Sequence, residues 1–374
     1  MEEELRSPLN LVDYFRDHHA QLDHWYYDEE SFVHRDVNSE PVLLSSFREV
    51  ETGLELDSWE RRRPVGLPGK IFFVDGRMRV YGRILLGMET LLLGEIIAGH
   101  AIWEKESGLS MGFSPHYPPE RRRILGVSQP LALTWQQEGT DPRIGLEKGI
   151  DFFPEGSERD SHTTREWDPS QQALFNALRK LEKKVVGQLI SQGVPLIQDG
   201  TVHANDPVFR TNVGPMGLVK RIENFRLPLA GNTLQVRQML FELDRGERTP
   251  FFGAFFNKGS VLQRVFTYTR LVERDDQYPL KGLVRCEVVI GEDISDRFKA
   301  DITSFFDRTV SLLPQLTGDY PWRRLPENIF PMIALEDHLG QFFLSPDRVR
   351  NSFRRVMKKA GMVKTQEIET SNPS

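Results

Sequence analysis

The sequence KIFFVDG, residues 70–76, places a carboxylate and a glycine directly after a short apolar run. Such a run is typical of a strand buried in the middle of a sheet. The same pattern returns in VPLIQDG at residues 194–200, and these stretches hold the only two Asp-Gly pairs in the chain. A carboxylate at the tip of a buried strand lies at the edge of a sheet, where α/β proteins build many of their sites. The alternative is that each Asp-Gly pair simply makes a turn.

The rest of the chain predicts a mixed α/β fold around these two strands. Apolar runs predict further strands, at residues 79–86, 91–103, 234–243, 261–272 and 278–290. Helical spacing and capping residues predict helices, at residues 8–27, 168–192, 295–313 and 345–359. We therefore expect a mixed sheet flanked by helices and ending in a C-terminal helix.

The predicted organisation has three parts. Residues 1–66 are expected to form an N-terminal helical or irregular segment, and residues 67–345 the main domain. Residues 346–374 are expected to form a basic helix followed by a disordered tail. Within the main domain, residues 104–168 are weakly patterned, so we expect an insertion or a long loop there.

The charge balance restricts what the protein can bind. The chain has 374 residues, with 48 Lys and Arg against 54 Asp and Glu, a formal net charge of −6. A contact with nucleic acid would therefore need a local basic patch, and the predicted C-terminal helix with Arg354 and Lys358 is one. The single cysteine, Cys286, forms no internal disulfide, and the acidic start MEEEL lacks the pattern of a signal peptide. We expect a cytoplasmic protein that does not enter a membrane.

Glu182 occupies an unusual place in the predicted helix 168–192. At about 100° per residue it falls within the apolar arc, one turn from Leu178 and from Val186. Burying a glutamate there is costly unless the side chain is paired with a basic group or binds a cation. A buried ion pair is the structural explanation, and a metal site is the functional one.

Three carboxylates, Asp75, Glu182 and Asp199, would together suit a hard divalent cation such as Mn²⁺ or Mg²⁺. Pairs of such ions about 4 Å apart are widely used for phosphodiester hydrolysis. The sequence therefore suggests a metal-dependent phosphodiester hydrolase. Lys220 or Arg221, on a later segment, would steady the charge that develops during the reaction.

These motifs resemble those of the NurA nucleases. The order is VDG at residues 74–76, Glu182 on a helix, and IQDG at residues 197–200, with Asp199 17 positions after Glu182. Further stretches that resemble the family follow in order, namely VG at 213–214, LVKR at 218–221, FTYTRL at 266–271 and FPMIAL at 330–335. Each motif is short, and the signal lies in their order and spacing over about residues 70–345.

The resemblance implies an RNase H-like mixed sheet and a homodimer around a central DNA channel. It implies 5′–3′ exonuclease and single-strand endonuclease activity on DNA, dependent on Mn²⁺ or Mg²⁺, in DNA end resection. The partner implied is a HerA-type hexameric ATPase that translocates DNA. Carried over by position, Asp75, Glu182 and Asp199 would hold the metal, while Lys220 and Tyr268 would lie near the scissile phosphate.

One position departs from the family. Many members have a histidine shortly after the late motif, whereas this chain has Glu336 there and His338 two residues on. The sequence leaves open whether Glu336, His338 or neither residue takes that role.

Two other functions compete with a nuclease. A non-catalytic DNA-binding or adaptor subunit of a translocase complex would keep the same carboxylates for structural reasons. The stretch GLSMG at residues 108–112 matches the nucleophile elbow of serine hydrolases, with Ser110 as the nucleophile. That elbow needs an apolar strand before it and a helix after it, whereas here charged residues precede it and prolines follow.

Overall fold

The computed structural model describes most of the main domain and part of each end. The described residues are 11–25, 48–51, 60–138, 143–147, 149–157, 168–203, 206–208, 214–220, 222, 233–255, 263–291, 296–317 and 328–359. Much of the predicted N-terminal segment, Arg221 and the predicted tail after residue 359 lie outside them.

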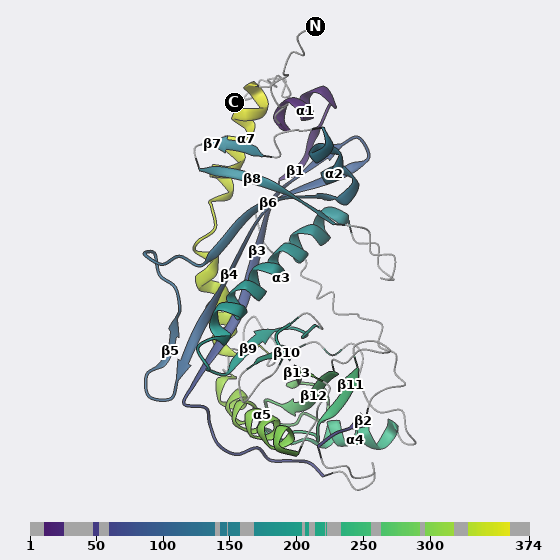
Figure 1. The fold of residues 1–374 in the computed structure, drawn as a ribbon, viewed down its shortest axis with the longest axis vertical. Helices are drawn as coiled ribbons and strands as arrows, with labels where there is room; N and C mark the ends of the chain where they lie inside the picture. Colours follow the sequence, from purple (N-terminus) through teal and green to yellow (C-terminus); the bar gives the residue numbers. More distant parts are fainter. Residues whose placement is uncertain are drawn as a thin grey trace, which may run out of the picture.

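Within these residues, thirteen strands form one mixed sheet (Figure 1). They are β1 (Gln21–Trp25), β2 (Arg48–Glu49), β3 (Lys70–Leu86), β4 (Glu89–Glu104), β5 (Gly108–Met111), β6 (Glu120–Ser128), β7 (Ile144–Glu147), β8 (Ile150–Ser157), β9 (Leu196–Asp199), β10 (Pro215–Val219), β11 (Phe252–Phe255), β12 (Gln263–Arg270) and β13 (Leu283–Ile290). Their order across the sheet is β2-β11-β12-β13-β10-β9-β3-β4-β6-β8-β7, with β1 paired to β3 and β5 paired to β4.

Helices flank this sheet, so the predicted mixed α/β class is confirmed. They are α1 (Leu11–Asp17), α2 (Gln129–Gln137), α3 (Pro169–Ile190), α4 (Thr233–Glu242), α5 (Asp296–Leu316), α6 (Phe330–Gly340) and α7 (Pro346–Lys359). Among the helices that the structure describes, none combines the length and the apolar composition needed to cross a bilayer.

The KIFFV stretch begins strand β3, which lies between β9 and β4 in the middle of the sheet. β9 runs parallel to β3 on one side, and β4 runs antiparallel to it on the other. The sequence predicts two strands over residues 70–86, but β3 is a single strand of 17 residues. The reason is that Gly76 stays in the ladder, opposite Ala98 of β4, instead of making a turn.

Alternate residues of β3 belong to two different cores. Phe72 and Val74 pack with the apolar side of α3, whereas Ile71 and Phe73 pack with residues from α5 and α6 on the other face. α3 runs across β3, β4 and β6 (Figure 1). It begins as predicted, because the Asp168 side chain accepts a hydrogen bond from the Ser170 amide (3.0 Å) and Pro169 occupies the first turn.

Of the two alternatives predicted for residues 104–168, an insertion or a long loop, the long loop is wrong for the described part of that segment. It contains β5 to β8 and α2, and β6 pairs with β4 over seven residues. Three consecutive arginines follow Glu120, the first residue of β6, and because of them the sequence pattern does not indicate a strand there. Arg122 pairs with Glu155 (3.4 Å) and Arg123 pairs with the buried Glu95 (3.1 Å), so these side chains belong to the fold.

Two further predictions are corrected. The helix expected at residues 8–27 ends at Asp17 in the structure and is followed by strand β1. Residues 234–243, expected as a strand, lie in and next to helix α4. There the spacing of Leu240 and Leu243, both buried, follows a helical period rather than alternation. The helices predicted at 168–192, 295–313 and 345–359 are confirmed as α3, α5 and α7.

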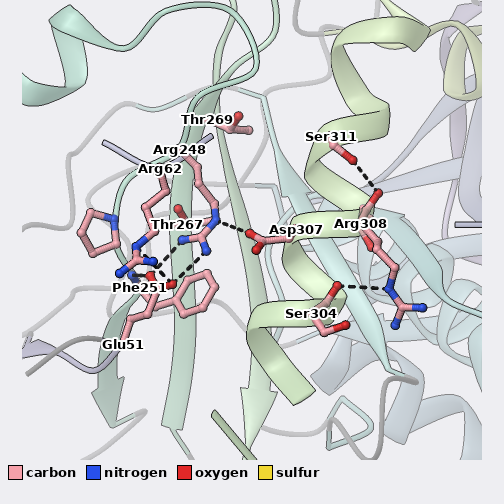
Figure 2. A network of polar contacts seen from close by, with 12 residues as sticks. Glu51, Arg62, Arg248, Phe251, Thr267, Thr269, Ser304, Asp307, Arg308 and Ser311 are labelled. Atoms are coloured by element: carbon pink, nitrogen blue, oxygen red, sulfur yellow. Dashed lines mark hydrogen bonds and ion pairs between the residues drawn. The ribbon is translucent and has the colours of Figure 1, made fainter. Parts of the chain in front are cut away.

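A buried ion network ties α5 to the segments beside the outer strands β2 and β11 (Figure 2). Arg248 is completely buried, and its Nη1 and Nη2 donate to the Glu51 carboxylate at 2.9 and 2.8 Å. Its Nε donates to Asp307 Oδ1 on α5 at 2.8 Å. The Phe251 ring lies 4.2 Å from its Cζ and covers the guanidinium group. This network fixes one end of the sheet, away from the predicted site.

Candidate functional site

The two Asp-Gly carboxylates meet where strands β3 and β9 separate. The parallel register pairs Phe73 with Ile197 and Val74 with Gln198, so Asp75 and Asp199 are the next residues along each strand. Neighbouring strands lie about 4.8 Å apart. Because side chains alternate, both aspartates point to the same face as Phe73 and Ile197, the face that α6 covers. The predicted position at the tip of a buried strand is confirmed for Asp199, which ends β9, and is wrong for Asp75, because β3 continues beyond it to Leu86.

Only one of the two pairs makes a turn. Gly200 has a positive φ of 81° and ends β9, as the turn interpretation predicts, whereas Gly76 continues along β3. Asp75 therefore projects from the interior of a long strand.

Asp75 is the most constrained member of the site. Its side chain is only 5% exposed. Its Oδ1 accepts a hydrogen bond from the Gly76 amide at 2.8 Å, while its Oδ2 is buried and accepts none from the described residues. Burial, followed by the negative charges of Asp199 and Glu336, raises the pKa of Asp75 well above its usual value. A buried carboxylate oxygen without a donor is stabilised either by a proton or by a cation.

Lys220, just after β10, places a positive charge beside the carboxylates of the site. Its Nζ lies 2.9 Å from Asp199 Oδ1, with the lysine side chain 13% exposed and that of Asp199 33% exposed. Burial by itself would lower the pKa of Lys220, but the charges of Asp199, Asp75 and Glu336 outweigh it and raise that pKa. Lys220 is therefore an ammonium ion, and it partly neutralises the carboxylates around it.

Glu182 reaches the same strand from the opposite face. It lies on α3 directly above Gly76, where a β-carbon would be only 2.5 Å from its Oε1. Because residue 76 has no side chain, the carboxylate can approach β3 next to Asp75. Its charge raises the pKa of Asp75 less than those of Asp199 and Glu336 do. The structure thus brings Glu182 to the site, but on the other side of the strand from the two aspartates.

The residues after Asp199 are held by α3. Lys183 of α3 pairs with Asp206 (3.1 Å), and the Asp206 carboxylate accepts a hydrogen bond from the His203 amide (2.6 Å). Arg179 of α3 hydrogen-bonds the His203 ring. Sequence reasoning missed Asp206, because no apolar strand precedes it. Its role in the structure is to anchor this segment beside the site.

Two predicted site residues lie elsewhere. Tyr268 on β12 is completely buried in a cluster with Phe252 and Phe266, and β10 and β13 lie between its strand and β9. Burial raises its pKa to about 12, so it remains a phenol. His338 is exposed at the surface of α6, where its Nδ1 hydrogen-bonds the Ala334 carbonyl group of its own helix (2.8 Å). The prediction that these two residues join the carboxylates is not supported by their positions.

The site contains the oxygen donors that bind a divalent cation, but these donors are not arranged as a complete metal site. Among the residues that the structure describes, no three carboxylate, imidazole or thiol groups already have the arrangement of a metal site. Asp199 is instead engaged by Lys220, and Glu182 lies across the strand. The buried oxygen of Asp75 and the oxygen-only donors nevertheless suit a hard divalent ion.

No family model matches the chain, and no curated protein matches it. The function of the site therefore rests on its geometry and on the sequence motifs.

Proposed function

We propose that the protein is a metal-dependent deoxyribonuclease that uses the carboxylates of Asp75, Asp199 and Glu182. The observation that supports this most directly is the environment of Asp75. An aspartate that is only 5% exposed, with one carboxylate oxygen lacking a donor among the described residues and with other carboxylates around it, is unfavourable as an anion unless a cation compensates its charge. Such strained groups are concentrated at functional sites.

The proposed ligands fit Mn²⁺ or Mg²⁺, since all of them are oxygen atoms. When bound, the divalent cation would activate water for attack on a phosphodiester and stabilise the leaving oxygen. Asp75 would be a ligand from the rigid middle of the sheet, and Asp199 a ligand from the end of β9. Glu182 would be a ligand from α3, which requires its side chain to extend past Gly76.

Lys220 has a role of its own in this proposal. Its ammonium group lies against Asp199 and balances part of the negative charge of the site. A phosphate group entering the site brings further negative charge, which the same ammonium group can attract. Lys220 would therefore orient Asp199 in the free protein and help to hold the phosphate when DNA is bound.

DNA is proposed as the substrate from the NurA-like order of motifs and from the basic helix α7. On α7, the side chains of Arg348, Arg354, Arg355 and Lys358 are all exposed, and two of them, Arg348 and Arg355, pair with Glu147. Exposed positive charge is what the DNA backbone contacts. The proposal extends to a homodimer with 5′–3′ exonuclease and single-strand endonuclease activity. Its proposed setting is DNA end resection with a HerA-type hexameric translocase.

A second candidate is a non-catalytic DNA-binding or adaptor subunit of such a complex. The ion pair between Lys220 and Asp199 favours it, because this pair stabilises the acidic site without any metal. The two proposals differ in one observable, which is cleavage.

The test is degradation of end-labelled single- and double-stranded DNA in the presence of Mn²⁺, Mg²⁺ or EDTA. Wild type is compared with Asp75→Asn and with the matched control Asp276→Asn, which makes the same chemical change at an exposed carboxylate far along the chain. We expect metal-dependent cutting that Asp75→Asn reduces by more than about 100-fold and Asp276→Asn leaves unchanged.

Equal cutting by wild type and Asp75→Asn would indicate a contaminating nuclease and contradict the assigned site. Absence of cutting, both alone and with a HerA-type translocase added, would contradict the nuclease and support the adaptor.

A further inference from the structure

Glu336 lies on the side of α6 that faces strand β3. Two later residues of the same helix mark this side. A β-carbon built at Gly99, the residue paired with Asp75, would be 3.0 Å from Leu339, and one built at Gly340 would be 2.6 Å from Arg77 Nη1. Residues three and four apart share one side of a helix, so Glu336 projects toward the same part of β3.

The main chain of Glu336 is fixed at this position. Arg77, two residues after Asp75 and on the same face of β3, donates from its Nη1 to the Glu336 carbonyl oxygen at 2.9 Å. Leu335 and Leu339 beside it are completely buried. The Glu336 side chain itself is half-buried, and its charge acts on both Asp75 and Lys220.

His338 is excluded from this position by the helix geometry. Two residues along a helix correspond to about 200°, so His338 and Glu336 point to opposite sides. The exposed imidazole ring hydrogen-bonds within α6. The structure therefore separates the two residues between which the sequence could not decide.

We infer that Glu336 is an additional carboxylate ligand of the same cation site, on the face of the sheet shared by Asp75 and Asp199. This inference rests on the proposed function. Glu336 lies on their side of β3, whereas Glu182 comes from the other side. Asp75, Asp199 and Glu336 are thus the carboxylates that can meet a cation without reaching past the strand.

A carboxylate at residue 336, rather than an imidazole, affects which metal ions the site prefers. Carboxylates suit Mn²⁺ and Mg²⁺, whereas imidazole also suits Zn²⁺ and Ni²⁺. With Glu336 in place the site offers oxygen ligands only. Replacing Glu336 by histidine would keep a ligand at the same point of α6 and move the preference toward softer metals.

The experiment is a calorimetric titration of Mn²⁺ into the DNA-free protein, which reads binding and not activity. The variants are Glu336→Gln, which keeps the size of the side chain but removes its charge, and His338→Gln on the same helix. Asp75→Asn reports on the site as a whole. We expect Glu336→Gln to weaken Mn²⁺ binding by at least about 10-fold and His338→Gln to change it by less than about twofold.

The outcomes separate this inference from the proposed function. Wild-type affinity in Glu336→Gln, together with lost binding in Asp75→Asn, would overturn the role of Glu336 and leave the metal site standing. A wild-type protein that binds no Mn²⁺ would overturn both. Loss of binding in His338→Gln but not in Glu336→Gln would assign the histidine instead.

The melting temperature of the metal-free Glu336→Gln variant distinguishes weaker Mn²⁺ binding from a folding defect. Removing one of several neighbouring negative charges should leave the metal-free melting temperature of Glu336→Gln unchanged or raise it. If Glu336→Gln nevertheless unfolds, Glu336→His carries the test, with Zn²⁺ and Mn²⁺ titrated separately. A rise of at least about 10-fold in the ratio of Zn²⁺ to Mn²⁺ affinity supports the inference, and an unchanged ratio contradicts it.

Discussion

Gly76 lies directly beneath the carboxylate of Glu182, so that any side chain at residue 76 would occupy the place of that group. A β-carbon there would be 2.5 Å from Glu182 Oε1 and 2.7 Å from Leu178 Cδ1. We expect Gly76→Ala to displace Glu182 and to lower metal-dependent cleavage by about 10- to 100-fold. The measurement is the initial rate of DNA degradation in Mn²⁺, with circular dichroism to confirm folding.

The matched control is Gly69→Ala, at the residue before β3, where a β-carbon would meet nothing within 4 Å. This variant should cleave like wild type. Full activity in Gly76→Ala would show that the position of Glu182 does not matter for the reaction.

Lys220 is expected to stabilise the metal-free protein. Removing its charge in Lys220→Met leaves Asp199 and Asp75 without the ammonium group that now lies among them. In EDTA we expect the free energy of unfolding to fall by about 1.5–3 kcal/mol, the range for a hydrogen bond to a charged group. Because a divalent cation can replace the lost charge, Mn²⁺ should raise the melting temperature of the variant more than that of wild type.

The comparison for Lys220 is Lys184→Met, which breaks the exposed ion pair with Glu120 and should change stability by less than about 1 kcal/mol. Equal stability of Lys220→Met and wild type in EDTA would contradict the proposal that the Lys220 ammonium group balances the negative charge of Asp199 and Asp75.

The exposed basic residues of α7 are expected to contact DNA. Reversing Arg354 and Lys358 to glutamate leaves intact the pairs of Arg348 and Arg355 with Glu147, so α7 should stay docked. DNA affinity at low salt should fall by at least about 10-fold, and its salt dependence should become weaker. Fluorescence anisotropy in EDTA measures binding without cleavage.

A double variant with the same change in charge, Lys105→Glu with Arg274→Glu, changes exposed residues outside α7. If it weakens DNA binding as much as the α7 variant does, the effect is one of net charge rather than of this helix.

The ion network around Arg248 predicts that replacing Arg248 greatly lowers the free energy of unfolding and leaves the candidate site unchanged. Arg248→Met leaves the Glu51 carboxylate, whose side chain is only 6% exposed, without its main partner. Breaking a buried ion pair in this way costs about 3–5 kcal/mol. Arg62→Met removes a 44% exposed partner of the same Glu51 at 3.5 Å and should cost less than about 1 kcal/mol. Chemical denaturation of the two variants gives both values, and similar losses would contradict the dominance of Arg248.

Elements with a strong local pattern could be predicted from the sequence. The Asp168 cap, the proline after it and the apolar arc of α3 predict a helix without any tertiary contact. The apolar run before Asp75 predicts a central strand for the same reason. By contrast, three arginines lie near the start of β6, and two of them are paired with Glu155 and Glu95 of other segments. Its place in the sheet depends on residues far away in the sequence.

Local sequence identifies the candidate carboxylates, because Asp75 and Asp199 each follow an apolar run and Glu182 interrupts an apolar helix face. Which of these groups meet depends on tertiary contacts. The parallel register of β3 and β9 joins the two aspartates, and Gly76 admits Glu182 from the other face. The packing of α6 brings Glu336, and not His338, toward Asp75. Such choices depend on strand register and helix rotation, which long-range packing sets and local sequence does not encode.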